Sequence, residues 1–110
     1  MKSKIIAVDF DGTLCTDCYP DIGSPNHKLI GYLQVEQCTG AKLILWTCRA
    51  GELLDAAVTW CKNEGLTFDA VNENLPEIIE AFGSDTRKIF ANEYIDDLAS
   101  TRFELPFEKR

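Results

Sequence analysis

A short acidic motif near the start of the chain has the residue types and spacing for phosphate chemistry. Asp9 and Asp11 are separated by one residue, and Gly12 follows them. Because residues two apart in an extended segment share a face, both carboxylates should point the same way. Like charges so close together need a cation or a raised pKa, and Gly12 permits a sharp turn that aims backbone N–H groups at an anion. The motif therefore suits a metal ion beside a phosphate group.

A second acidic pair, Asp96 and Asp97, follows the apolar residues Tyr94 and Ile95 near the other end of the chain. Hard oxygen ligands favour Mg²⁺, which keeps several waters and takes only one or two carboxylates plus substrate oxygens. The acids of the two motifs match this requirement. We therefore expect the two ends of the chain to meet at one Mg²⁺ site.

Two further residues could hold the oxygens of a phosphoryl group. Thr47 ends an apolar run, and Lys88 lies eight residues before Asp96, with Arg87 beside it as a competitor for the same role. A hydroxyl and an ammonium group at neighbouring strand ends would bind the phosphoryl oxygens while Mg²⁺ neutralises the remaining charge.

The elements that must position these residues alternate between strands and helices. Two continuous apolar runs, 4–8 and 42–46, are typical of parallel strands buried on both faces. The other expected elements are a helix capped by Ser24 with Pro25 at its first position, a helix around 53–61, a weak strand over 66–71, a short helix around 78–82 and a last strand at Tyr94 and Ile95. This order predicts a three-layer α/β/α sandwich with a central, mostly parallel sheet. Residues 14–23 should form a loop or small hairpin over the carboxyl edge of that sheet, where ligands bind in such folds.

Composition limits the remaining options. The chain has 110 residues, which predicts a single domain over 1–110. Its net charge of −7 disfavours nucleic acid as a partner without excluding it. Apolar runs stay well below the ~20 residues that span a bilayer, and the five cysteines are an odd number, so we expect a cytoplasmic protein with reduced thiols and no membrane partner.

In this order, the motifs resemble those of haloacid-dehalogenase-like (HAD) phosphohydrolases. The four matching segments are Asp9 to Thr13, Thr47 after its apolar strand, Lys88, whose spacing favours it over Arg87, and Tyr94 to Asp97. The match extends from Lys4 to about Ala99. Residues 43–52 resemble the second motif of small, capless and mostly uncharacterised HAD proteins of bacteria and phages. The gaps between the motifs hold no spare domain, so we expect the HAD-like Rossmannoid fold without a cap.

The resemblance implies a phosphomonoesterase with a covalent intermediate. Asp9 would be the nucleophile that forms an aspartyl phosphate, and Asp11 would be the general acid and base. Thr47 and Lys88 would hold the phosphoryl oxygens. The implied Mg²⁺ ligands are Asp9, the backbone carbonyl of Asp11, and Asp96, with Asp97 as a further ligand or an outer-shell partner.

Several alternatives stay open. Arg49 could bind a substrate phosphate or carboxylate, or form a salt bridge to Glu52 or Asp55. With an open site, specificity would come from residues 15–23 and Arg49, and the phosphorylated substrate could be of any size, a nucleic-acid end included. Cys15 and Cys18 have the spacing of a redox or zinc pair, but we expect neither role. Runner-up functions are a phosphate-accepting signalling module and a catalytically idle partner-binding domain. The alternating residues Phe103, Leu105 and Phe107 predict an edge strand or a tail that packs in a homo-oligomer.

Overall fold

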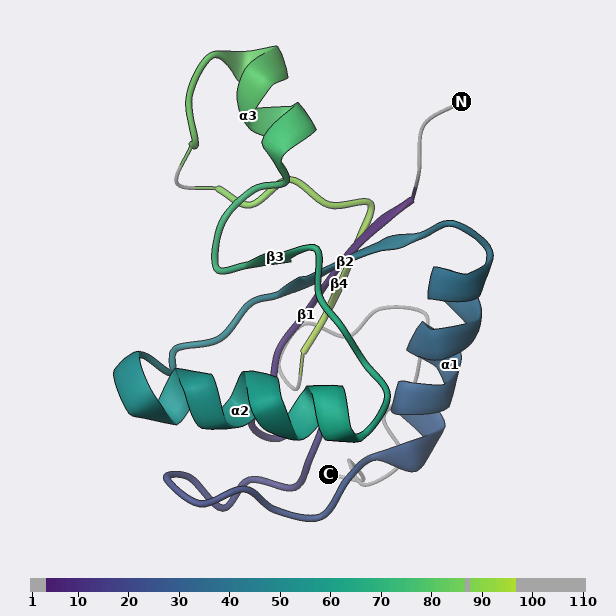
Figure 1. Cartoon of the computed structure of the whole chain (residues 1–110), viewed down its shortest axis with the longest axis vertical. Helices are drawn as coiled ribbons and strands as arrows, with labels where there is room; N and C mark the ends of the chain where they lie inside the picture. Colours follow the sequence, from purple (N-terminus) through teal and green to yellow (C-terminus); the bar gives the residue numbers. More distant parts are fainter. Residues whose placement is uncertain (1–3, 87, 97–110) are drawn as a thin grey trace.

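The computed structural model describes residues 4–86 and 88–96, which form an α/β fold around one parallel sheet. Its elements are β1 (Ile5–Val8), α1 (His27–Cys38), β2 (Lys42–Leu45), α2 (Gly51–Asn63), β3 (Ala70–Val71), α3 (Pro76–Phe82) and β4 (Glu93–Ile95). The strand order is β3-β2-β1-β4, and every pairing is parallel. Figure 1 shows the four strands crossing the middle of the molecule, with α3 well apart from α1 and α2. The α/β class and the parallel sheet predicted from the sequence are confirmed.

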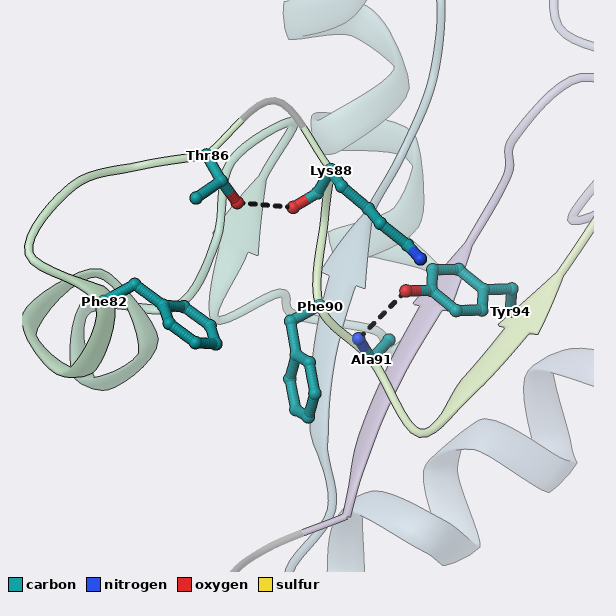
Figure 2. A pocket seen from close by; sticks show the side chains of 6 residues that line it. All are labelled: Phe82, Thr86, Lys88, Phe90, Ala91 and Tyr94. Atoms are coloured by element: carbon teal, nitrogen blue, oxygen red, sulfur yellow. Dashed lines mark hydrogen bonds between the residues drawn. The ribbon is translucent and has the colours of Figure 1, made fainter.

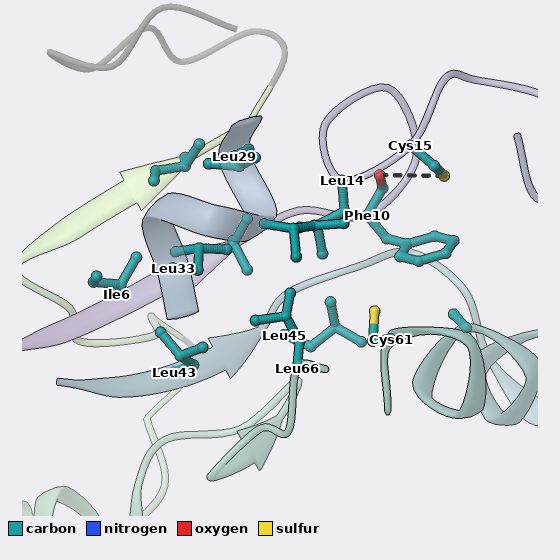
Figure 3. Close-up of a cluster of buried hydrophobic side chains, with 14 of the residues drawn as sticks. Ile6, Phe10, Leu14, Cys15, Leu29, Leu33, Leu43, Leu45, Cys61 and Leu66 are labelled. Carbon is teal, nitrogen blue, oxygen red and sulfur yellow. Dashed lines mark hydrogen bonds between the residues drawn. The ribbon is translucent and has the colours of Figure 1, made fainter. Parts of the chain in front are cut away.

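Strand β1 is buried along its whole length, as its continuous apolar sequence predicts. Its alternate side chains belong to two different hydrophobic clusters, because successive residues of a strand face opposite sides of the sheet. Ile6 and Val8 pack with residues of α1 and α2 in the larger cluster, part of which is drawn in Figure 3. Ile5 and Ala7 belong to the second cluster, against which Ile78 of α3 packs.

Helix α1 begins later than expected. The cap is Asn26, whose side-chain Oδ1 accepts a hydrogen bond from the backbone N–H of Leu29 at 3.1 Å, so the prediction of Ser24 and Pro25 was wrong by two residues. Pro25 instead forms an antiparallel bridge with Cys15, which closes the expected hairpin. The buried Asn26 also donates from Nδ2 to the carbonyl oxygen of Thr13 at 2.9 Å, so the cap ties α1 to the loop after β1.

Strand β3 is shorter than the weak strand predicted over 66–71. The backbone N–H of Asp69 donates to the carbonyl oxygen of Leu43 at 2.8 Å, but the N–H of Leu43 donates to the side-chain Oδ2 of Asp69, at 2.8 Å, instead of to a backbone carbonyl. Strand pairing with β2 therefore begins only at Ala70. The segment around Phe103 and Phe107, and Asp97, lie outside the described residues. Among the helices that are described, none has the length and apolar character needed to cross a membrane.

Candidate functional site

The carboxyl ends of all four strands meet at one edge of the sheet, because the strands are parallel. Three backbone hydrogen bonds continue the ladders one residue past the strands: Asp9 N to Ile95 O at 2.9 Å, Trp46 N to Val8 O at 2.9 Å and Asn72 N to Leu45 O at 2.8 Å. The residues that follow these strands are thereby held in line along the edge. Asp9, Thr47 and Asp96, predicted from the sequence to belong to one site, are among them.

Asp9 and Asp96 follow neighbouring strands and are both partly exposed. The Asp9 N–H bond to Ile95 sets the two acids side by side in the register of β1 and β4. Asp9 continues the phase of Ile5 and Ala7, which assigns its side chain to the sheet face of the second cluster. Within 4–86 and 88–96, no three Asp, Glu, His or Cys side chains group closely enough to hold a metal ion.

The side chain of Asp11 is bound by Arg49. Arg49 donates from Nε to Oδ2 at 2.9 Å and from Nη2 to Oδ1 at 2.8 Å, a two-pronged ion pair. Of the two alternatives for Arg49, the salt bridge to Glu52 or Asp55 was therefore wrong. Arg49 precedes α2, and its side chain reaches back to the loop after β1, while its Nη1 also donates to the carbonyl oxygen of Leu53 in α2 at 3.4 Å. Its role in substrate binding stays a prediction, because the guanidinium already binds the carboxylate of Asp11.

Arg49 also connects this pair to the loop over residues 17–23. Its Nη2 donates to the carbonyl oxygen of Asp21 at 2.9 Å, and its guanidinium lies 5.0 Å from the ring centre of Phe10 and 5.1 Å from that of Tyr19. The hydrogen bonds to Asp11 raise the pKa of Arg49, so the guanidinium keeps its charge. Only 1% of this side chain is exposed, against 20% for Asp11. Arg49 is thus a buried cation that fixes both Asp11 and the loop.

The turn after β1 is tight and buried. Gly12 adopts a left-handed conformation with φ of 79°, which a residue with a side chain adopts only with strain. The backbone N–H groups of Thr13 and Leu14 both donate to the carbonyl oxygen of Phe10, at 3.1 and 2.9 Å. Phe10, Leu14 and Cys15 belong to the larger cluster, and Figure 3 shows the thiol of Cys15 hydrogen-bonded to the carbonyl oxygen of Phe10. This apolar anchoring explains how a loop with two acids keeps a fixed shape.

Thr47 is positioned by a residue that the sequence did not single out. The side-chain Oδ1 of Asn72 accepts the backbone N–H of Thr47 at 2.8 Å, and Asn72 has a positive φ of 55° directly after β3. The Thr47 hydroxyl in turn accepts the backbone N–H of Arg49 at 3.1 Å. An asparagine directly after an apolar strand, a position that favours left-handed turns, was the available signal.

Lys88 lies on the loop between α3 and β4. It lines a cavity of about 390 Å³ together with residues of that loop, Phe82 of α3 and Tyr94 of β4. In Figure 2 its side chain extends from the loop in the direction of Tyr94. The loop is held by Asn74, a buried residue that sequence reasoning missed: its Nδ2 donates to Asp85 Oδ1 at 2.9 Å.

Arg87, the competitor of Lys88, and Asp97, the fourth predicted acid, fall in parts of the chain that are not described. The cysteines Cys15 and Cys18 are free thiols, the first buried and the second exposed. The predicted roles of Asp9, Asp11, Thr47, Lys88 and Asp96 in catalysis or metal binding stay predictions. The positions of Asp9, Asp11, Thr47 and Asp96 after the carboxyl ends of their strands support them, whereas Lys88 lies on the loop that precedes β4.

These features define an α/β protein with a parallel four-stranded sheet and acids at its carboxyl edge. No protein-family profile matches the chain, and no curated protein matches it. Among solved structures it is similar to a conserved protein encoded by Bacteroides thetaiotaomicron, with 43% sequence identity and a TM-score of 0.76; the match covers 87% of this chain and 77% of that one. The chain belongs to the same family as this conserved protein.

Proposed function

We propose that the protein is a Mg²⁺-dependent phosphomonoesterase of the HAD type, with a capless three-layer α/β/α fold, which works through an aspartyl phosphate on Asp9. The observation that carries the proposal is the position of Asp9 beside Asp96. The hydrogen bond from Asp9 N to Ile95 O, with an N···O distance of 2.9 Å, fixes this position. Ligands of open α/β sheets bind at this edge. The turn at Gly12 and the alignment of Thr47 along the same edge add groups that suit a phosphoryl oxygen.

The donor set fits Mg²⁺ as two carboxylates supplemented by a carbonyl. Arg49 engages both carboxylate oxygens of Asp11, which leaves the backbone carbonyl of Asp11 as the oxygen that residue can offer. Asp9 and Asp96 supply the two carboxylates, a number that Mg²⁺ accepts together with water and substrate oxygens. A set of this kind is consistent with the lack of three clustered acidic side chains among the described residues. When bound, Mg²⁺ would neutralise charge on the transferring phosphoryl group.

In the first step, an Asp9 carboxylate oxygen forms a bond to phosphorus as the bond to the ester oxygen breaks. Asp11 gives a proton to the departing oxygen, and the alcohol leaves. In the second step, Asp11 removes a proton from a water molecule, which attacks phosphorus and releases inorganic phosphate from Asp9. The proton given to the leaving alcohol and the proton taken from water therefore pass through the same carboxyl group.

The ion pair with Arg49 has a consequence for these steps. Protonation turns one carboxyl oxygen of Asp11 into a hydroxyl, which donates a hydrogen bond and accepts one from Arg49 less well than a carboxylate oxygen does. One of the two bonds of the pair is therefore weaker when Asp11 acts as an acid. In the second step the carboxylate form is required, and the intact pair suits it. Arg49 thus acts as a positioning residue for Asp11 in this proposal.

The test is hydrolysis of a panel of phosphate monoesters with Mg²⁺ and with a chelator. We expect turnover by the wild type with Mg²⁺, none with the chelator, and none for Asp9→Asn. Asp55→Asn is the matched control, because Asp55 is an exposed acid on α2. Undiminished turnover by Asp9→Asn would contradict the nucleophile assignment. A phosphorylated protein that never turns over would favour a phosphate-accepting signalling module instead.

A further inference from the structure

Among the described residues, the cavity beside Lys88 combines this cation with an aromatic wall. Its volume is about 390 Å³, within the range of small-molecule sites. The residues that line it are Phe82, Thr86, Lys88, Phe90, Ala91 and Tyr94. Figure 2 shows Phe82 reaching it from α3, Tyr94 from β4, and the other residues from the loop between them.

Two phenylalanine rings of this cavity are exposed to solvent. Phe82 is 60% exposed and Phe90 is 42% exposed, and their ring centres lie 6.5 Å apart with the planes inclined by 67°. Tyr94, at the other side, meets the edge of Trp46 with ring centres 5.7 Å apart. Exposed aromatic faces gathered around a concave site favour a flat apolar ligand, which gains contact area without losing hydrogen bonds.

The cavity wall is held in place by buried polar contacts. Asn74, which is 1% exposed, accepts the backbone N–H of Phe90 at 2.7 Å and donates to the carbonyl oxygen of Lys88 at 3.3 Å. The hydroxyl of Tyr94 donates to the carbonyl oxygen of Ile89 and accepts the backbone N–H of Ala91 at 3.2 Å. The backbone of 88–91 is therefore fixed from two sides, as expected of a preformed site.

The cavity lies on the same sheet face as the proposed nucleophile. Tyr94 pairs in register with Ala7, and Asp9 is two residues further along β1 in the same phase. Two residues of a strand span about 7 Å. Tyr94 is therefore the residue of the cavity wall whose register position is nearest to Asp9. Lys88, at the cavity wall, supplies a positive charge to the cavity.

From this geometry we infer that the cavity is a substrate subsite for the planar aromatic part of a phosphate monoester, an aryl phosphate or the base of a nucleotide. The inference rests on the proposed phosphatase activity and adds the substrate class to it. Substrate specificity then comes from Phe82, Phe90 and Tyr94, in addition to residues 15–23, for which the sequence analysis predicted this role. A sugar or alkyl phosphate would make no comparable contact with the rings.

Kinetics with two esters test the subsite. Phenyl phosphate carries a ring, and glycerol phosphate does not. We expect Phe90→Ala and Phe82→Ala each to lower kcat/KM for phenyl phosphate about three- to ten-fold through KM, the range of one aromatic contact, and to change glycerol phosphate less than about two-fold. Val35→Ala is the control, because Val35 is 62% exposed on α1. An equal loss for both esters, or no loss for either, would overturn the inference.

Binding of a phosphonate separates this inference from the proposed function. Phenylphosphonate keeps the ring and the anion but has no ester bond to hydrolyse. In amide spectra of the ¹⁵N-labelled protein, we expect titration to shift the signals of Ala91 and Tyr94 in the wild type, with weaker binding in Phe90→Ala. Shifts of these signals without hydrolysis of any ester would support the aromatic binding site and contradict the proposed phosphatase activity. Hydrolysis of phenyl phosphate without any shift at the cavity would reject the subsite alone.

Discussion

Replacing Arg49 by alanine removes the cation that holds Asp11, and its cost can be worked out from the contacts. The variant loses two charge-assisted hydrogen bonds to Asp11, at 2.8 and 2.9 Å, and one each to the carbonyl oxygens of Asp21 and Leu53. Breaking a buried pair by removing one partner costs about 3–5 kcal/mol. Because the Asp11 side chain is 20% exposed and recovers some hydration, we expect the free energy of unfolding to fall by about 3 kcal/mol.

Urea unfolding of the wild type, Arg49→Ala, Asp11→Asn and the double variant measures this cost and the coupling between the two residues. We expect a coupling of about 1.5–3 kcal/mol, as for hydrogen bonds to charged groups. The control is Glu36→Ala, which removes a surface pair with Lys4 whose side chains are 25% and 31% exposed, and it should cost less than about 1 kcal/mol. A loss for Arg49→Ala no larger than that control, or a coupling near zero, would refute the reasoning.

Three further predictions concern the buried groups. Burial raises the pKa of Cys61 to about 12 from an ordinary value of 9.0, so the unfolded chain loses this proton first as pH rises. The contribution of the protonated Cys61 thiol to the free energy of unfolding is complete below pH 9 and is lost between pH 9 and 12. Between pH 8 and pH 10.5, urea unfolding should therefore show a smaller fall in the free energy of unfolding for Cys61→Ala than for the wild type. A thiol reagent at pH 7.5 should label Cys18, Cys38 and Cys48 rapidly and the buried Cys15 and Cys61 only after unfolding, whereas rapid labelling of all five would contradict the burial. Asn74→Ala should lower the free energy of unfolding by about 2 kcal/mol, because it leaves the Phe90 N–H without its partner, and an unchanged urea midpoint would count against that contact.

The sequence predicted what depends on short-range pattern. The apolar runs of β1 and β2 were visible because buried parallel strands are continuously hydrophobic. The acids after β1 and β4 could then be assigned to one sheet edge without knowledge of any side-chain contact. The resemblance of the motifs added their proposed roles.

Contacts between distant residues were beyond the sequence. One of the two alternatives for Arg49 was a salt bridge three to six residues away, but its partner Asp11 lies 38 residues away. The cap of α1 shifted to Asn26 because that side chain also satisfies Thr13, 13 residues away. Asn74 was assigned to a turn, and its function as the centre of the loop before β4 depends on partners 11–16 residues further along the chain. Local pattern carries no information about such pairings.

The most direct measurement of the central claim is the intact mass of the protein quenched during reaction with a phosphate monoester and Mg²⁺. The proposed role of Asp11 predicts that Asp11→Asn slows the release of phosphate and accumulates the mass of one phosphoryl group. Peptide mapping should locate it on Asp9, and the Asp9→Asn variant should never acquire it. A protein that hydrolyses the ester with no phosphoryl group on Asp9, or that acquires one at another residue, would contradict the account.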